Sequence, residues 1–193
     1  MDLGLPSGTL WATCNVGASK PSDAGLYFQW GDTQGYTANQ VGTGEGQKKF
    51  ANDWSDYKWG TFPNFTKYTT TGATLELEDD AAHVNMGGNW HMPTPTQIQE
   101  LLDNTTTTWT TQDGVNGVTF TSKKDTSKSI FIPAAGSAWD GSVRFIGRHV
   151  LVWSSMLGTD DALDGQSLYV GSGGVTLDYS NRFNGLSVRG VVG

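Results

Sequence analysis

Residues that could carry out chemistry are few in this sequence, and their spacing fits no known catalytic pattern. The three histidines, at positions 83, 91 and 149, lack the spacing of zinc ligands. Ser154 and Ser155 follow Trp153 without the G-x-S-x-G motif that presents a nucleophilic serine. The single cysteine, Cys14, cannot form an internal disulfide, and we expect it to be a small buried apolar residue. The sequence therefore predicts that this protein is not an enzyme and uses no cofactor.

An acidic run offers one possible cation site. Glu76, Glu78, Asp79 and Asp80 lie together where a helix is expected to begin. Carboxylates at that place interact favourably with the helix dipole, and this is the reading we prefer. Oxygen ligands also suit calcium, so a calcium-dependent glycan-binding accessory domain is an alternative. The sequence has no EF-hand pattern and no E-P-N or Q-P-D tripeptide, and we predict no metal ligands.

The stretch from 136 to 183 points to binding rather than catalysis. Charged, aromatic and aliphatic residues are mixed there within glycine-flanked loops, and no structural rule explains them. Apolar and arginine side chains displayed together are typical of a binding surface. An ordinary variable surface with no dedicated site is the alternative. We predict that the ligand-binding residues cluster in large part on one exposed face: Asp140, Arg144, Phe145, Arg148, His149, Leu151, Met156, Gln166, Tyr169, Thr176, Asp178, Tyr179 and Phe183.

Two helices are expected to support this surface. Leu77, Ala81 and Val84 fall at helical spacing within 75–86, before Gly87. A second helix begins after Thr94, which can cap it. Pro95 takes its first position, Gln97 completes a capping box, and the helix closes at 103–104. Its buried stripe is expected to comprise Ile98, Leu101 and Leu102.

The remaining expected elements are strands separated by glycine turns. They lie at 9–13, 105–111, 117–121, 129–132, 151–154, 167–170, 175–179 and 186–191. The segments 117–121 and 129–132 should form a hairpin, and the last strand should return beside the first. A short helical turn is expected at 21–24. The polar segment 31–74 has no clear period, and we expect its aromatic residues to pin it to the body.

Composition favours one loop-rich α+β domain over residues 1–193. Twenty-six glycines and eight tryptophans accompany only 16% charged residues. The formal charge of −7 argues against a nucleic-acid or anionic-membrane partner. No run is long enough to span a membrane and no signal peptide precedes Asp2. We expect the chain to be trimmed from a longer protein.

Several framework residues are expected to be structural. Trp11, Trp90 and Trp153 lie among glycines or small residues, so they should be substantially buried. At least one of Arg182 and Arg189 should pair with a carboxylate or with backbone carbonyls rather than face a ligand.

Seven segments, in order along nearly the whole chain, resemble one family, the Fib-succ-major paralogous (FISUMP) domain of gut bacteria and their phages. They are 2–18 (DLGLPSGTLWATCNVGA), 27–33 (YFQWGDT), 77–82 (LEDDAA), 87–94 (GGNWHMPT), 130–136 (IFIPAAG), 152–155 (VWSS) and 181–191 (NRFNGLSVRGV). The chain departs from the family pattern at His91, Val152, Met156 and Gly190. These departures leave the expected fold in place, and those at 152 and 156 bear on function.

The resemblance implies a C-type-lectin-like fold with two short helices and a mainly antiparallel sheet. Similar domains are variable proteins of diversity-generating retroelements, whose C-terminal codons are mutagenised to make new binding surfaces. The function this implies is an adhesin-like domain that binds a cell-surface protein or glycan, on a bacterial surface or a phage tail. A structural module of a surface lipoprotein, with no dedicated site, is the alternative.

Overall fold

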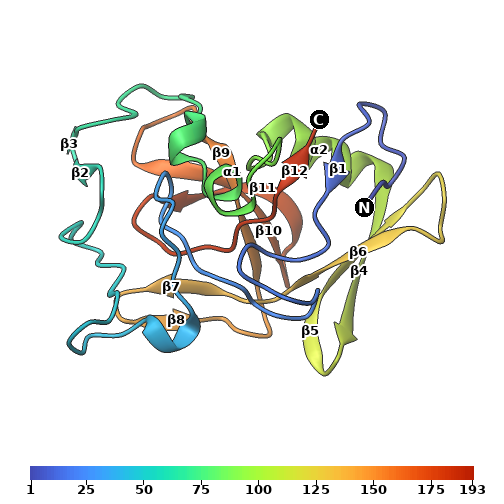
Figure 1. Cartoon of the computed structure of the whole chain (residues 1–193), viewed down its shortest axis with the longest axis horizontal. Helices are drawn as coiled ribbons and strands as arrows, with labels where there is room; N and C mark the ends of the chain where they lie inside the picture. The colour runs from blue at the N-terminus through green and yellow to red at the C-terminus, as the bar shows by residue number, and fades with distance from the viewer.

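The structure is a computed structural model that describes all residues 1–193, and it is of the α+β class, as expected (Figure 1). Its helices are α1 (Ala81–Met86) and α2 (Pro95–Asn104), with 3-10 turns at Ala38–Gln40 and Leu77–Asp79. Its strands are β1 (Leu10–Trp11), β2 (Gly60–Thr61), β3 (Asn64–Phe65), β4 (Thr105–Gln112), β5 (Val115–Ser122), β6 (Ser129–Pro133), β7 (Ser137–Trp139), β8 (Ser142–Arg144), β9 (Val150–Leu157), β10 (Asp164–Gly171), β11 (Gly174–Asn181) and β12 (Val191–Val192). Neither helix has the length and apolar character needed to cross a membrane.

Helix α2 forms as its sequence predicts. The Thr94 hydroxyl accepts the backbone N–H of Gln97 at 3.2 Å, and the Gln97 side chain accepts the backbone N–H of Thr94 at 3.0 Å. This capping box satisfies N–H groups that a helix start leaves without partners. Ile98 and Leu101 are fully buried, which fixes α2 against the larger core cluster.

The helix expected over 75–86 is shorter than predicted. A 3-10 turn takes 77–79, and Asp80 then caps α1 by accepting the backbone N–H of His83 at 2.9 Å. Asp80 also accepts the backbone N–H of Met92, so it ties the start of α1 to a distant segment. Leu77 and Val84, expected to face the core, are exposed instead. The helical turn expected at 21–24 is a plain turn.

Two three-stranded antiparallel sheets enclose the larger core. Their strand orders are β4-β5-β6 and β11-β10-β9. The 117–121 and 129–132 segments form the expected hairpin. Val118 and Phe120 from the first sheet and Val152 and Leu168 from the second are fully buried in the same cluster, beside α2. Both β4 and β11 are edge strands.

The first and last strands of the chain pair with each other, as expected. β1 pairs antiparallel with β12, with Trp11 opposite Val191. Of the predicted last strand 186–191, only Val191 is in a strand, because Leu186 and Ser187 make isolated bridges to other segments instead. Arg189 is fully buried beside this closure, where its guanidinium donates to Ala12 O, Asn15 Oδ1 and Phe131 O at 3.0 Å each.

Aromatic residues pin the irregular segment 31–74, as predicted. Trp54, Tyr57 and Tyr68 are buried, and Phe62 is the only aromatic residue of this segment that is exposed. Arg182 joins this segment to the body. Its guanidinium donates to the Tyr57 hydroxyl at 2.9 Å, and also to the carbonyls of Lys67 at 3.0 Å, Tyr68 at 2.9 Å and Ala162 at 3.0 Å. Both arginines are therefore structural, paired to carbonyls rather than carboxylates.

The tryptophan prediction holds at two positions of three. Trp11 and Trp153 are fully buried, and Trp153 donates its indole N–H to Phe28 O at 2.7 Å. Trp90 is only half-buried, because it packs against Gly190 and Met86 near the surface. Cys14, expected to be buried, is also half-exposed.

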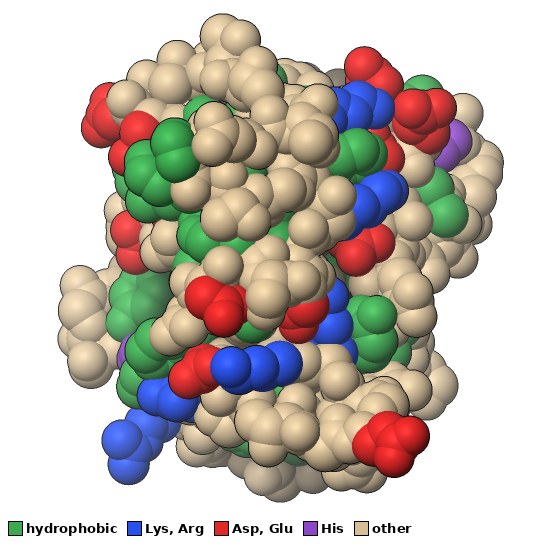
Figure 2. Space-filling view, turned by 90° about the vertical axis from the view of Figure 1, so that its left-hand side faces the viewer, with side chains coloured by type: hydrophobic (Ala, Val, Ile, Leu, Met, Phe, Trp, Pro, Cys, Tyr) green, Lys and Arg blue, Asp and Glu red, His purple; other side chains and the backbone are tan.

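Opposite charges alternate on the side of the molecule that carries β2 and β3. Figure 2 shows Lys and Arg side chains there lying next to Asp and Glu, with hydrophobic side chains between them. The chain contains ion pairs between such side chains, for example Lys48 with Asp56 at 3.6 Å and Lys49 with Asp140 at 3.3 Å. The acidic excess of the chain is thus not gathered into one anionic patch on this side.

Candidate binding groove

The loop 145–149 between β8 and β9 presents the most exposed aromatic side chain of the predicted site. Phe145 is 47% exposed and its φ is 62°. A left-handed backbone is uncommon for a bulky residue and is held only where the surroundings demand it. They do so here, because the backbone N–H groups of Arg148 and His149 both donate to Phe145 O at 3.0 Å. Gly147 anchors the loop through a bond to Ala134 O at 2.8 Å.

Three rings from two segments form a continuous stack. Phe145 lies on His149 with ring centroids 4.5 Å apart and planes 21° from parallel. The edge of His149 then meets Tyr169 of β10 at 5.2 Å. Gly171 leaves room for this arrangement, because a Cβ there would overlap the Tyr169 hydroxyl and crowd His149.

A groove of about 720 Å³ lies beside this stack, where β4 faces the β10–β11 turn. Its apolar surface comes from Trp109, Phe145, Val170 and Val175. Its size is within the usual range of ligand pockets, and an apolar lining with few polar groups is typical of them. The residues that line it are Thr107, Trp109, Phe145, Gly147, Arg148, His149, Val170, Gly171, Ser172, Gly174 and Val175.

The groove carries one permanent charge, that of Arg148, whose side chain is exposed and makes no hydrogen bond or ion pair. Partial burial, together with the nearby Arg148 charge, lowers the pKa of His149 below its ordinary value. The His149 imidazole is therefore neutral at pH 7, and its side chain hydrogen-bonds to no serine, cysteine or carboxylate. Such a groove can stack on flat or apolar groups and attract one anion.

The structure brings part of the predicted site together here. Phe145, Arg148 and His149 line the groove, and Tyr169 touches His149. Leu151 and Thr176 lie directly opposite Tyr169 on the neighbouring strands, and Asp178 continues their face of the sheet two residues along.

Other predicted residues lie in neighbouring or separate places. On the β7–β8 hairpin, Arg144 stacks on Trp139 at 4.2 Å and Asp140 pairs with Lys49. Tyr179 is on the opposite face of β11, with its hydroxyl 3.4 Å from that of Thr159. Met156 is near the far end of β9, opposite Thr74.

Two predicted site residues are buried rather than on an exposed face. Gln166, only 8% exposed, donates its side-chain amide to Leu157 O at 2.8 Å. Phe183 is 7% exposed and packs edge-on against Trp54 at 4.8 Å. In both cases a partner from a distant or bulged segment determines burial, which strand alternation alone does not reveal.

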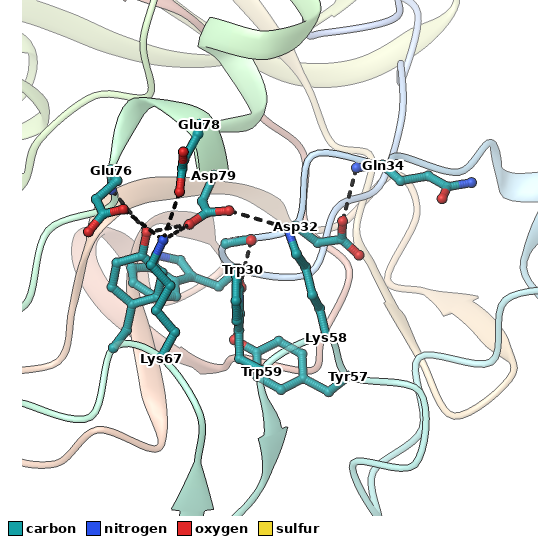
Figure 3. Close-up of polar contacts among 12 residues, drawn as sticks. Trp30, Asp32, Gln34, Tyr57, Lys58, Trp59, Lys67, Glu76, Glu78 and Asp79 are labelled. Carbon is teal, nitrogen blue, oxygen red and sulfur yellow. Dashed lines mark hydrogen bonds and ion pairs between the residues drawn. The ribbon is translucent and has the colours of Figure 1, made fainter.

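The acidic run already holds a cation of the chain itself. Lys67 Nζ lies 2.7 Å from Glu76, 3.2 Å from Glu78 and 2.6 Å from Asp79 (Figure 3). Although burial opposes ionisation of Asp79, hydrogen bonds from Lys67, Tyr68 and Lys58 lower its pKa. The hydrogen bonds of Lys67 to Asp79, Glu76 and Glu78 raise the pKa of Lys67 above its ordinary value. Glu76, Glu78 and Asp79 could each offer one ligand atom to a metal ion, and the Lys67 ammonium pairs with all three.

His83, His91 and Ser154 have structural partners, whereas the buried Ser155 hydroxyl has no hydrogen-bond partner. His83 Nδ1 lies 3.1 Å from Trp90 O, and His91 Nδ1 lies 2.8 Å from Met92 O. Ser154 donates its hydroxyl to Met156 O, and both Ser154 and Ser155 are buried.

Sequence reasoning missed the β4 side of the groove. Thr107 and Trp109 lie in a threonine-rich strand that was expected to be polar and at an edge, but not part of the site. An exposed tryptophan in such a strand is the signal that could have identified it, since Trp109 is 44% exposed. Comparison of the chain with models of protein families, with curated proteins and with solved structures found no match.

Proposed function

We propose that this chain is a non-enzymatic ligand-binding domain that uses the groove between β4 and the 145–149 loop. The observation that carries the proposal is the Phe145–His149–Tyr169 stack, with Phe145 exposed at one end, beside an apolar groove. Folding alone gives no reason to keep a phenylalanine both exposed and in a left-handed backbone. Exposed aromatic anchors beside an arginine are typical of binding hot spots.

The finer proposal is a C-type-lectin-like domain of the FISUMP type, displayed on a bacterial surface or phage tail, that binds a cell-surface protein or glycan. Support comes from the ordered resemblance along the sequence and from the pairing of the first and last strands. The proposal includes diversification by a retroelement, because the predicted residues Phe145, Arg148 and His149 lie in the C-terminal part of the chain on a loop anchored by its backbone. A near-identical template repeat beside the gene, differing only at adenines, would support this origin.

A binding comparison on arrays tests the proposed site. Fluorescently labelled protein is applied to a glycan array and to an array of bacterial surface proteins. The double variant Phe145→Ala/His149→Ala should lose every signal that the unmodified protein gives. The control Leu77→Ala/Val84→Ala removes two exposed apolar side chains from the 3-10 turn at Leu77–Asp79 and from α1, and it should retain binding. Equal signals from both variants would show that the groove is not the site.

A further inference from the structure

The outer edge of β4 has backbone groups without partners. Ser122 of β5 donates its N–H to Lys128 O, so the backbone N–H and C=O groups of the even-numbered β5 residues point toward β6. The odd-numbered residues of β5 therefore bond to β4, where the register places them opposite even-numbered residues. The N–H and C=O groups of Thr107 and Trp109 consequently point away from the sheet, and they make no hydrogen bond within the chain.

This edge lacks the usual protection against strand pairing. Natural edge strands carry charges, prolines, bulges or a covering segment. β4 contains six threonines, one tryptophan and one glutamine, and it pairs with β5 over eight consecutive residues without a bulge. β11, an edge strand of the second sheet, differs: Leu177 O accepts the Thr176 hydroxyl, and the Tyr179 N–H donates to Asp178. Side chains of β11 thus satisfy part of its own edge, whereas those of β4 do not.

The unpaired part of β4 borders the groove. Thr107 and Trp109 supply both the free backbone groups and one wall, while Val170 and Val175 lie among the lining residues contributed by the second sheet. An extended chain hydrogen-bonded to β4 would place every second side chain on the groove side. Backbone bonds would give such a chain its affinity, and the groove would select its side chains.

We propose that β4 accepts an extended peptide segment of a partner protein as an added strand, with apolar side chains at alternate positions in the groove. This rests on the proposed function and names the class of ligand that the site takes. A second copy of this chain fits less well. Its own β4 could offer only Trp109 as a large apolar side chain, and Trp109 already lines the groove.

The charge of Arg148 further restricts which sequences the proposed peptide segment can have. Arg148 is the one charged residue of the groove lining, and it has no partner within the chain. A glutamate or aspartate on the incoming strand would complement it, whereas lysine or arginine there would be repelled. The segment is therefore expected to alternate Val, Leu or Phe with polar residues and to carry an acidic residue near one end.

The test uses an immobilised library of synthetic peptides of about six residues. Apolar residues alternate with Thr or Glu, and both ends are blocked. The tightest binder is then resynthesised with a methyl group on one backbone amide at a time. Methylation of the amides that face β4 should weaken binding about tenfold each, equivalent to about 1.4 kcal/mol. Methylation of the intervening amides, which face solvent, should have little effect.

Variants of the protein test the same bonds from the other side. Thr107→Pro removes one outward N–H beside the groove and should weaken binding by a similar factor, because proline is tolerated at an edge. Thr111→Pro removes an outward N–H away from the groove and is the matched control. Circular dichroism verifies that both variants fold. In unmodified protein, amide exchange at Thr107 and Trp109 should be fast and should slow when the peptide binds.

The outcomes separate this inference from the proposed function. Peptide binding that requires Phe145 and His149, but is unaffected by alternate methylation and by Thr107→Pro, would overturn strand addition and leave the groove as a binding site. Failure of every library peptide to bind would also overturn strand addition, while the glycan array tests the groove independently. Concentration-dependent protection of the Thr107 and Trp109 amides without peptide would show self-association through β4 and would overturn the choice of partner.

Discussion

Replacing Arg182 by methionine should strongly destabilise the fold. Methionine retains an unbranched apolar stem but removes four hydrogen bonds. Two of the partners, the Tyr57 hydroxyl and Tyr68 O, are in buried contacts, while the Lys67 and Ala162 carbonyls are partly accessible to water. The variant also loses the guanidinium that lies over the Phe65 ring at 4.0 Å.

The magnitude follows from these contacts. A buried partner left without its hydrogen bond costs about 1–3 kcal/mol, and an accessible one costs about 0.5–1.5 kcal/mol. Removing the buried charge offsets part of this, because its desolvation no longer opposes folding. We therefore expect a net loss of about 4 kcal/mol. That is a large share of the roughly 5–15 kcal/mol that stabilises a domain.

Urea unfolding followed by tryptophan fluorescence measures this loss. The matched control is Arg148→Met, which truncates an exposed arginine without partners and should change stability by less than about 0.5 kcal/mol. Arg182→Met should also make the segment 57–68 more sensitive to protease, because Arg182 holds it against Ala162. A folded Arg182→Met protein within about 1 kcal/mol of the parent would refute this reasoning.

Four further changes test other features of the structure. Burial, with the nearby Asp161 and Asp178, raises the pKa of Asp164 to about 6. The stability contributed by the protonated Asp164 carboxyl is fully present below about pH 4 and is lost as pH rises through about 6. The free energy of unfolding of Asp164→Asn should therefore exceed that of the parent by about 1–2 kcal/mol at pH 7.5, with no gain near pH 4. Trp153→Ala should cost about 3–5 kcal/mol in chemical denaturation and the half-buried Trp90→Ala clearly less; equal costs would contradict the burial difference. Gly136→Ala should lower Tm markedly, because Gly136 has φ 67° and an added Cβ would overlap Arg144 O; an unchanged Tm would contradict this geometry. Millimolar calcium should not raise the Tm of the parent protein, since Lys67 occupies the acidic cluster, and a clear rise would show that calcium displaces it.

Elements with local signals could be predicted from the sequence, whereas those that depend on distant partners could not. Thr94, Pro95 and Gln97 determine the start of α2 through contacts within four residues, and that start was predicted correctly. α1 begins at Ala81, later than predicted, because the Asp80 carboxylate caps it and also bonds to Met92 on another segment. The β7–β8 hairpin was missed because its strands have three residues each and its turn places Asp140 at a positive φ.

The candidate site shows the same division. Phe145 and His149 were identified because an aromatic and a histidine in a glycine-flanked loop have no evident structural role. Gln166 and Phe183 were also predicted as site residues. Their burial depends on Leu157 O and on Trp54, which no local pattern indicates. Trp109 was missed for the converse reason, since only the fold places β4 beside the β10–β11 turn.

Under the proposed function, stability and binding depend on different parts of the chain. Arg182 and Arg189 join distant segments through carbonyl groups, so these links hold whatever side chains those segments carry. The 145–149 loop is likewise held by main-chain bonds, from Gly147 to Ala134 O and from Gly136 to His149 O. Its side chains can therefore change with little effect on the core, as a surface that adapts to different ligands requires. The backbone edge of β4 beside the loop stays constant through such changes. Under the proposed function, a fixed strand edge would supply affinity for any extended segment, and the loop would choose among segments.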